Sequence, residues 1–150
     1  MWTPPPDRPH PRIRVGVDLV GVARLTRLVT DHPDGAAALF TARERAYCDG
    51  KRRRYEHLAA RFAAKEAVLK AFGTGLGQRM RWTDVEVVVE VSGRPRVHLH
   101  GEVAAWARRR GLVDLDLSLS HTADLAIAQV VAVWDEASRV VGQSGGRAEG

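Results

Sequence analysis

The chain has 150 residues, of which 45% are hydrophobic and 27% are charged. This length and composition favour one globular domain with a substantial core and argue against disorder in the middle of the chain. No apolar run approaches the roughly 20 residues that a membrane-spanning helix needs. The formal net charge of +5 favours an anionic partner, which could be a phosphate-rich cofactor, an acidic protein or a nucleic acid.

The domain is predicted to occupy residues 12–136, between a proline-rich tail at 1–11 and a glycine-rich tail at 137–150, both expected to be flexible. The N-terminal tail carries no apolar segment typical of a signal peptide. Cys48 is the single cysteine, so an intrachain disulfide is excluded. Both features favour a cytoplasmic protein.

The N-terminal half is predicted to hold one strand and three helices. "RIRVGVDLV" alternates apolar residues as a strand does, and "GVARLTRLV" then places them at helical spacing. In "FTARERAYC", Thr41 and Glu44 have the spacing of a capping box, which predicts the start of a second helix. A third helix is expected from about residue 55 to Gly73, where "GTGLG" permits a sharp exit.

The C-terminal half is predicted to be mostly strands. "DVEVVVEV" and "PRVHLHG" flank "SGR" as a hairpin, and "EVAAWARRRG" reads as a short helix. "DLDLSLSH" and "DLAIAQVVAVW" are two further strands. Because strands and helices occur in clusters, the fold class is predicted to be α+β, with a largely antiparallel sheet packed with helices.

The third helix, "RFAAKEAVLKAF", carries charges on an otherwise apolar surface. Arg61 and Lys65 share one polar stripe and Glu66 and Lys70 share another, each pair spaced by four residues. Glu66 and Lys70 could simply form an ion pair on the surface of the helix. However, the apolar flanks leave little room for an exposed stripe, and buried charges are costly unless they are paired or bind a ligand.

Asp18 is an unusual residue for the apolar strand "VGVDLV". It could face water at a sheet edge or cap the following helix. Alternatively, Asp18 and Glu66 could share a hard cation such as Mg²⁺, which typically takes one or two carboxylates and leaves other positions to water and phosphate oxygens. Lys70 would then face the same phosphates.

The remaining candidates carry weaker signals. His121 lies beside Ser120 and Thr122 at a strand-to-strand turn, which favours contact with an anion, although a lone histidine is more often structural. His98 and His100 lack a third metal ligand, and Cys48 has no partner that marks a nucleophile. The basic run at residues 51–54 is typically a solvated face.

Three stretches taken together resemble one family. "VGVDLVGVARL", "RFAAKEAVLKAFGTGL" and "LSLSHTADLAIAQVVA" are similar, in order and separation, to motifs of the holo-acyl-carrier-protein synthases, the small branch of the 4′-phosphopantetheinyl transferases. The resemblance covers residues 12–134. It implies the phosphopantetheinyl transferase fold and Mg²⁺-dependent transfer of the phosphopantetheine arm of coenzyme A to a carrier-protein serine, with release of adenosine 3′,5′-bisphosphate. Whether the carrier serves fatty-acid or secondary metabolism stays open.

The resemblance also implies roles for individual residues. Asp18 and Glu66 would bind Mg²⁺, and Lys70 would neutralise charge on the breaking pyrophosphate. Glu66 or a water held by the metal could take the serine proton. The expected cofactor-binding residues are Arg61, Lys65, Gly73, Gly75, His121 and Thr122.

The expected partners are an acidic carrier protein and further copies of the chain. Arg24, Arg27 and Leu28, on the helix after Asp18, are the predicted docking residues, while Asp31 and Asp34 depart from the more basic pattern of the family. The family commonly forms a homotrimer with coenzyme A between neighbours.

Two alternatives stay open at this point. A nucleic-acid-binding module would fit the net charge and the run at 51–54, but the aromatic residues are few and scattered. A coenzyme-A-binding relative without transfer activity is disfavoured because Asp18, Glu66 and Lys70 are all present.

Overall fold

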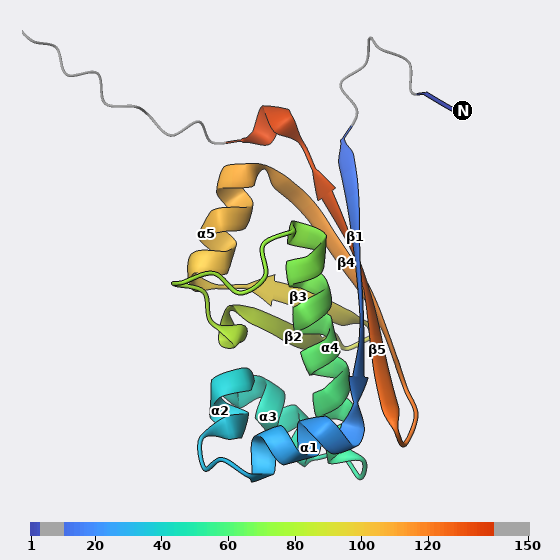
Figure 1. Ribbon diagram of the computed structural model, residues 1–150, viewed down its shortest axis with the longest axis vertical. Coiled ribbons are helices and arrows are strands. Elements are labelled where there is room, and N and C mark those ends of the chain that lie inside the picture. Colours follow the sequence, from blue (N-terminus) through green and yellow to red (C-terminus); the bar gives the residue numbers. More distant parts are fainter. Residues whose placement is uncertain (4–10, 140–150) are drawn as a thin grey trace, which may run out of the picture.

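A long helix, α4 (Arg54–Phe72), lies along the inner face of an antiparallel sheet (Figure 1). This computed structural model describes residues 1–3 and 11–139. The sheet has the strand order β1 (Arg12–Gly21), β5 (Leu125–Trp134), β4 (Leu112–His121). A hairpin of β2 (Val85–Val89) and β3 (Pro95–Leu99) packs on α4 and β4. All strand pairs are antiparallel, so the predicted α+β class is confirmed.

The remaining helices gather at the two ends of α4 (Figure 1). Helices α1 (Val22–Thr30), α2 (Gly35–Leu39) and α3 (Ala42–Asp49) lie near its N-terminal end, and α5 (Gly101–Arg110) lies near its C-terminal end. Short 3₁₀ turns occupy η1 (Trp82–Asp84) and η2 (Glu136–Ser138). Within the described residues, none of these helices has the length and apolarity that a bilayer crossing requires.

The local sequence signals explain most helix boundaries. Thr41 and Glu44 form the predicted capping box, each side chain bonding to the backbone N–H of the other residue. Helix α4 ends at Gly73, whose φ of 76° is a left-handed conformation that glycine adopts without strain. Helix α2 is not predicted from the sequence, because "GAAAL" is too short for an apolar period to show.

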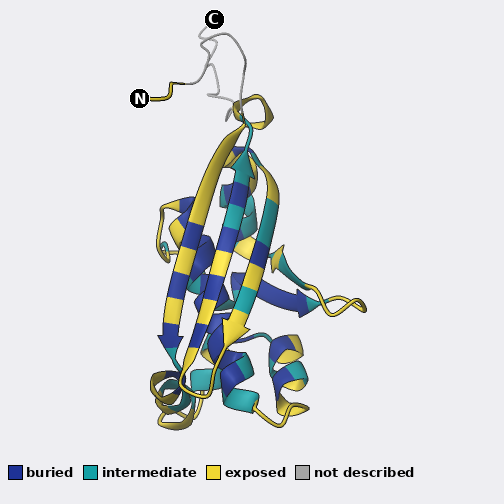
Figure 2. Cartoon of the chain, turned by 90° about the vertical axis from the view of Figure 1, so that its right-hand side faces the viewer, coloured by how far each residue is buried: buried dark blue, intermediate teal, exposed yellow. Residues whose placement is uncertain are grey.

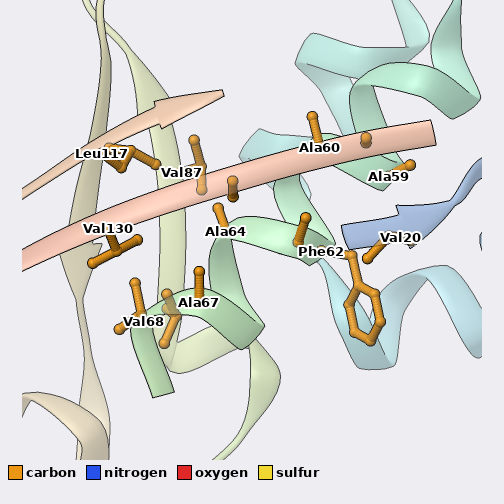
Figure 3. Packing of buried hydrophobic residues seen from close by; sticks show 14 of the residues in the cluster. Val20, Ala59, Ala60, Phe62, Ala64, Ala67, Val68, Val87, Leu117 and Val130 are labelled. Atoms are coloured by element: carbon orange, nitrogen blue, oxygen red, sulfur yellow. The ribbon is translucent and has the colours of Figure 1, made fainter. Parts of the chain in front are cut away.

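Close packing between β1 and α4 depends on small residues. A Cβ at Gly16 would lie 1.9 Å from the carbonyl oxygen of Ala67, so only glycine permits this approach. Figure 3 shows Ala64, Ala67 and Val68 of α4 packed against the core together with Val130 of β5. The approach brings Asp18, two residues beyond Gly16 on the same face of β1, next to α4.

The outer face of the sheet is exposed (Figure 2), and its β1 and β5 part is mostly apolar. Ile13, Val15, Val17 and Leu19 of β1 are 55–65% exposed, and Ile127 of β5 is 40% exposed. Thus the alternating apolar residues that identify β1 as a strand lie on its outer face. Gly16, Asp18 and Val20 are the residues buried on its inner face. A contiguous exposed apolar face of this kind is typical of a protein–protein interface.

The predicted tails fall mainly on residues 4–10 and 140–150, which lie outside the described residues.

Candidate functional site

Asp18, Glu66 and Lys70 meet where β1 crosses α4. Nζ of Lys70 donates hydrogen bonds to Oδ1 of Asp18 at 2.8 Å and to the carbonyl oxygen of Val17 at 3.1 Å. The Asp18 side chain is 10% exposed, whereas that of Lys70 is 57% exposed and reaches in from solvent. The structure therefore brings together the three residues that the sequence predicts to carry the chemistry.

The two carboxyl groups form a site that favours a cation. Burial raises the pKa of Glu66, and the neighbouring Asp18 carboxyl raises it further, since two adjacent negative charges repel. Asp18 in turn raises the pKa of Lys70. Oδ2 of Asp18 is buried without a hydrogen-bond donor. A buried carboxylate oxygen without a donor, beside a second carboxyl group, is a donor set that fits Mg²⁺.

The number of carboxylates also suits a metal shared with a phosphate ligand. Among the described residues, no group of three or more His, Cys, Asp or Glu side chains is arranged to hold a metal. A closed, all-protein cage is therefore not built there. Two carboxylates would leave most of the octahedral positions of Mg²⁺ to water and phosphate oxygens.

A pocket of about 430 Å³ opens beside this carboxylate pair. Gly73 and Gly75, with φ of 76° and 62°, shape the turn that closes one side of the pocket after α4 ends. We call this the carboxylate pocket; its lining residues are Glu66, Leu69, Lys70, Gly73, Gly75, Leu76 and Trp82.

Arg61 and His121 lie at a second pocket, of about 190 Å³, which we call the histidine pocket. Arg61 is 3% exposed, donates to the carbonyl oxygen of His57 at 3.2 Å and stacks its guanidinium over Tyr47 at 4.3 Å from the ring centre. The His57 and His121 rings lie 5.1 Å apart. Burial and the neighbouring His121 and Arg61 lower the pKa of His57. This pocket shares no lining residue with the carboxylate pocket.

Lys65 belongs to the core and lies at neither pocket. Its side chain is fully buried, and Nζ donates to Oε1 of Glu44 at 2.7 Å, to the Trp82 carbonyl oxygen at 3.1 Å and to the Val85 carbonyl oxygen. An ammonium group has three donors, so all of them are used inside the protein. The prediction that Lys65 binds the cofactor does not fit this buried position.

The other predicted residues lie on exposed surfaces around the two pockets. Oγ1 of Thr122 accepts a hydrogen bond from the backbone N–H of Leu125 at 3.1 Å and so holds the β4–β5 turn next to His121. Arg24 and Arg27 are exposed on α1 and Leu28 is half-buried there. The positive charge of Arg24 is close enough to Glu66 to offset part of the rise in the pKa of that carboxyl group. The predicted docking helix is therefore adjacent to the carboxylate pocket.

Some residues at the two pockets carry no signal in the sequence. Tyr47 of α3 and His57 of α4 line the histidine pocket, Glu56 of α4 lies beside it at His121, and Trp82 of η1 lines the carboxylate pocket. These residues come from three elements, so no local spacing groups them. By contrast, Cys48 is buried and its pKa is raised to about 11, mainly by burial, which agrees with the absence of a nucleophile signal.

Comparison with known proteins gives a consistent result. The sequence model of a family described as "4'-phosphopantetheinyl transferase superfamily" matches residues 14–130. A holo-[acyl-carrier-protein] synthase of Moorella thermoacetica is 47% identical over 109 residues, which are 73% of this chain and 84% of that protein. The corresponding protein of Salinispora arenicola is 48% identical over 120 residues, 80% of this chain and 97% of that one.

Solved structures show the same likeness. The "Chronobacterium ammoniagenes ACPS-CoA complex" has a TM-score of 0.74 at 33% identity and covers 83% of this chain and 98% of its own. A holo-[acyl-carrier-protein] synthase from Neisseria meningitidis has a TM-score of 0.73 at 29% identity, with 79% and 96% covered.

Proposed function

Since the chain belongs to the 4′-phosphopantetheinyl transferase superfamily, among the enzymes that attach phosphopantetheine to acyl carrier protein, we propose how it does so. The donor is coenzyme A, the acceptor is a serine of an apo acyl carrier protein, and the second product is adenosine 3′,5′-bisphosphate. Asp18 and Glu66 hold Mg²⁺. The observation that carries this proposal is the meeting of Asp18, Glu66 and Lys70 beside an open pocket.

The reaction joins the serine oxygen to the β-phosphorus of coenzyme A and breaks the bond from that phosphorus to the bridging oxygen. Catalysis of such a transfer consists mostly of positioning and of stabilising negative charge. Lys70, exposed above Asp18, neutralises the charge that collects on the leaving phosphate. When bound, Mg²⁺ supplies further positive charge at the same phosphates.

The candidate general base for the serine proton is Glu66 or a water that the metal would hold. Glu66 borders the carboxylate pocket, through which a serine side chain can approach.

Coenzyme A binding extends from the carboxylate pocket to the histidine pocket of a neighbouring copy. Gly73 and Gly75 shape the first pocket, and Arg61, His121 and Thr122 lie at or beside the second. Because the two pockets share no lining residue, a ligand between subunits is the simplest way to use both. The exposed apolar face of the sheet supports a homotrimer, since packing it against other copies would remove it from water.

Carrier docking is assigned to α1, through Arg24, Arg27 and Leu28. Two exposed arginines next to the carboxylate pocket attract an acidic carrier and orient its serine towards Glu66. We place the enzyme in the cytoplasm, where coenzyme A and carrier protein are both present.

Intact-mass measurement of the carrier tests the proposal. An apo acyl carrier protein incubated with the enzyme, coenzyme A and Mg²⁺ should gain the mass of one phosphopantetheine group, and adenosine 3′,5′-bisphosphate should appear in equal amount. Adding a chelator should stop the gain, and excess Mg²⁺ should restore it. Undiminished transfer in chelator would contradict the metal assignment.

A further inference from the structure

Glu56 is a buried carboxylate that the proposed chemistry does not use. It lies on α4, is 6% exposed, and its Oε1 is buried without a hydrogen-bond partner. Oε2 lies 3.6 Å from Nε of Arg53, whose side chain is 70% exposed. A partner so exposed compensates little of the cost of burying a charge. The burial of Glu56 therefore calls for a second partner at Oε1.

That partner is His121. Oε1 of Glu56 lies 3.8 Å from Nδ1 of His121, an ion-pair distance that is longer than a hydrogen bond. His121 ends β4, and its side chain is 29% exposed at the histidine pocket, beside His57 and Arg61. The contact thus joins a helix to a strand at the point where a ligand would enter.

A carboxylate at one ring nitrogen determines what the other nitrogen does. When Nδ1–H donates to a carboxylate, the ring orientation and the tautomer are both fixed. Nε2, at the other side of the ring, is then free to face a ligand. It accepts a hydrogen bond when the ring is neutral and donates one when the ring is protonated, so contact with a phosphate oxygen requires the protonated ring. The Arg61 guanidinium repels a further cation in this pocket and attracts an anion, so the ligand class that fits is a phosphate group.

We propose that Glu56 is a positioning residue, which holds His121 through Nδ1 so that Nε2–H of the protonated ring donates to a phosphate of the bound nucleotide. The identity of that nucleotide as part of coenzyme A rests on the proposed function. Glu56 itself does not contact the ligand. Its effect on binding must therefore pass entirely through His121.

A double-mutant cycle tests this dependence. The variants are Glu56→Leu, His121→Ala and the double variant. The control is Glu102→Leu, a half-exposed glutamate of α5 that is paired with Arg109. The readout is the Kd for adenosine 3′,5′-bisphosphate by calorimetry. We expect Glu56→Leu to raise Kd about tenfold in the otherwise unchanged enzyme, and by less than about twofold when residue 121 is alanine. An equal loss in both backgrounds, or no loss in either, overturns the inference.

A second measurement needs no ligand and so separates this inference from the proposed function. ¹⁵N NMR of His121, at a pH where the ring is neutral, should show the proton on Nδ1 in the unchanged enzyme and on Nε2 in Glu56→Leu. Glu56→Gln, whose amide oxygen still accepts a hydrogen bond, should keep the proton on Nδ1, and Glu56→Ala replaces Glu56→Leu if the latter does not fold. An unchanged tautomer in Glu56→Leu overturns the inference. Failure of the unchanged enzyme to transfer phosphopantetheine contradicts the proposed function instead.

Discussion

Some charged side chains of α4 face the core and others face a pocket, because successive side chains of a helix point about 100° apart. Lys65 points into the core and has all its donors satisfied, whereas Glu66, the next residue, borders the carboxylate pocket. The sequence predicts that these charges have partners, but it does not distinguish a protein partner from a ligand. The protein partner of Lys65 is Glu44, which lies 21 positions away from it in the chain, so no local pattern links the two residues.

The buried pair of Lys65 and Glu44 should be essential for stability. Lys65→Met removes one partner and leaves a fully buried carboxylate without its cation. We expect the free energy of unfolding, from urea denaturation, to fall by about 3–5 kcal/mol. Lys51→Met, at an exposed position, is the control. A loss below about 1 kcal/mol would show that the pair contributes no more than a surface ion pair does.

At the scale of elements, the sequence predicts those with a strong local period and misses those without one. The alternation of β1, the capping box at Thr41 and the glycine that ends α4 all act locally, and each is confirmed. The outward direction of the apolar face of β1 is not local, because it depends on which side of the strand α4 covers. Similarly, the histidine pocket needs α3, α4 and β4 together, so its residues could not be grouped from spacing.

Helix α1 should determine affinity for the carrier without changing the chemical step. Arg27→Glu reverses a charge that faces solvent, and it is a cleaner change than one at Arg24, whose charge reaches Glu66. We expect KM for an acidic carrier to rise about tenfold, with kcat retained and the effect reduced at high salt. Steady-state transfer assays measure both constants.

Arg108→Glu on α5 changes the net charge equally and is the control. An equal rise in KM for this variant would show that overall charge, rather than α1, governs docking.

At the scale of the molecule, we propose one explanation, an assembly of several copies, for the two pockets and the exposed sheet face. An assembly would cover the apolar face and would bring residues of two copies to one ligand. The sequence alone indicates such an assembly only through the family resemblance. The structure adds the surface that the assembly would use, formed by alternate residues of β1 and β5 (Figure 2).

A charge on that face should dissociate the assembly. Val15→Lys places an ammonium group where an apolar side chain is 65% exposed in the single chain. We expect light scattering at micromolar concentration to give a trimer mass for the unchanged protein and a monomer mass for the variant, with loss of transfer and unchanged circular dichroism. Burying an unpaired charge in an interface costs several kcal/mol.

Val91→Lys makes the same change in the β2–β3 hairpin, where the valine is fully exposed; it is the control and should remain trimeric. A monomer mass for the unchanged protein, or a trimer mass for Val15→Lys, would contradict this use of the face.

The central claim is that the meeting point of Asp18, Glu66 and Lys70 performs the transfer, and Glu66→Gln tests it most directly. This variant keeps the shape of the side chain and removes its charge, so the fold should survive. The measurement is the rate of holo-carrier formation by intact-mass spectrometry at saturating coenzyme A and Mg²⁺, with Glu102→Gln as the control. We predict a loss of at least about 100-fold for Glu66→Gln and an unchanged rate for the control. Near-normal turnover by a folded Glu66→Gln enzyme would contradict the account.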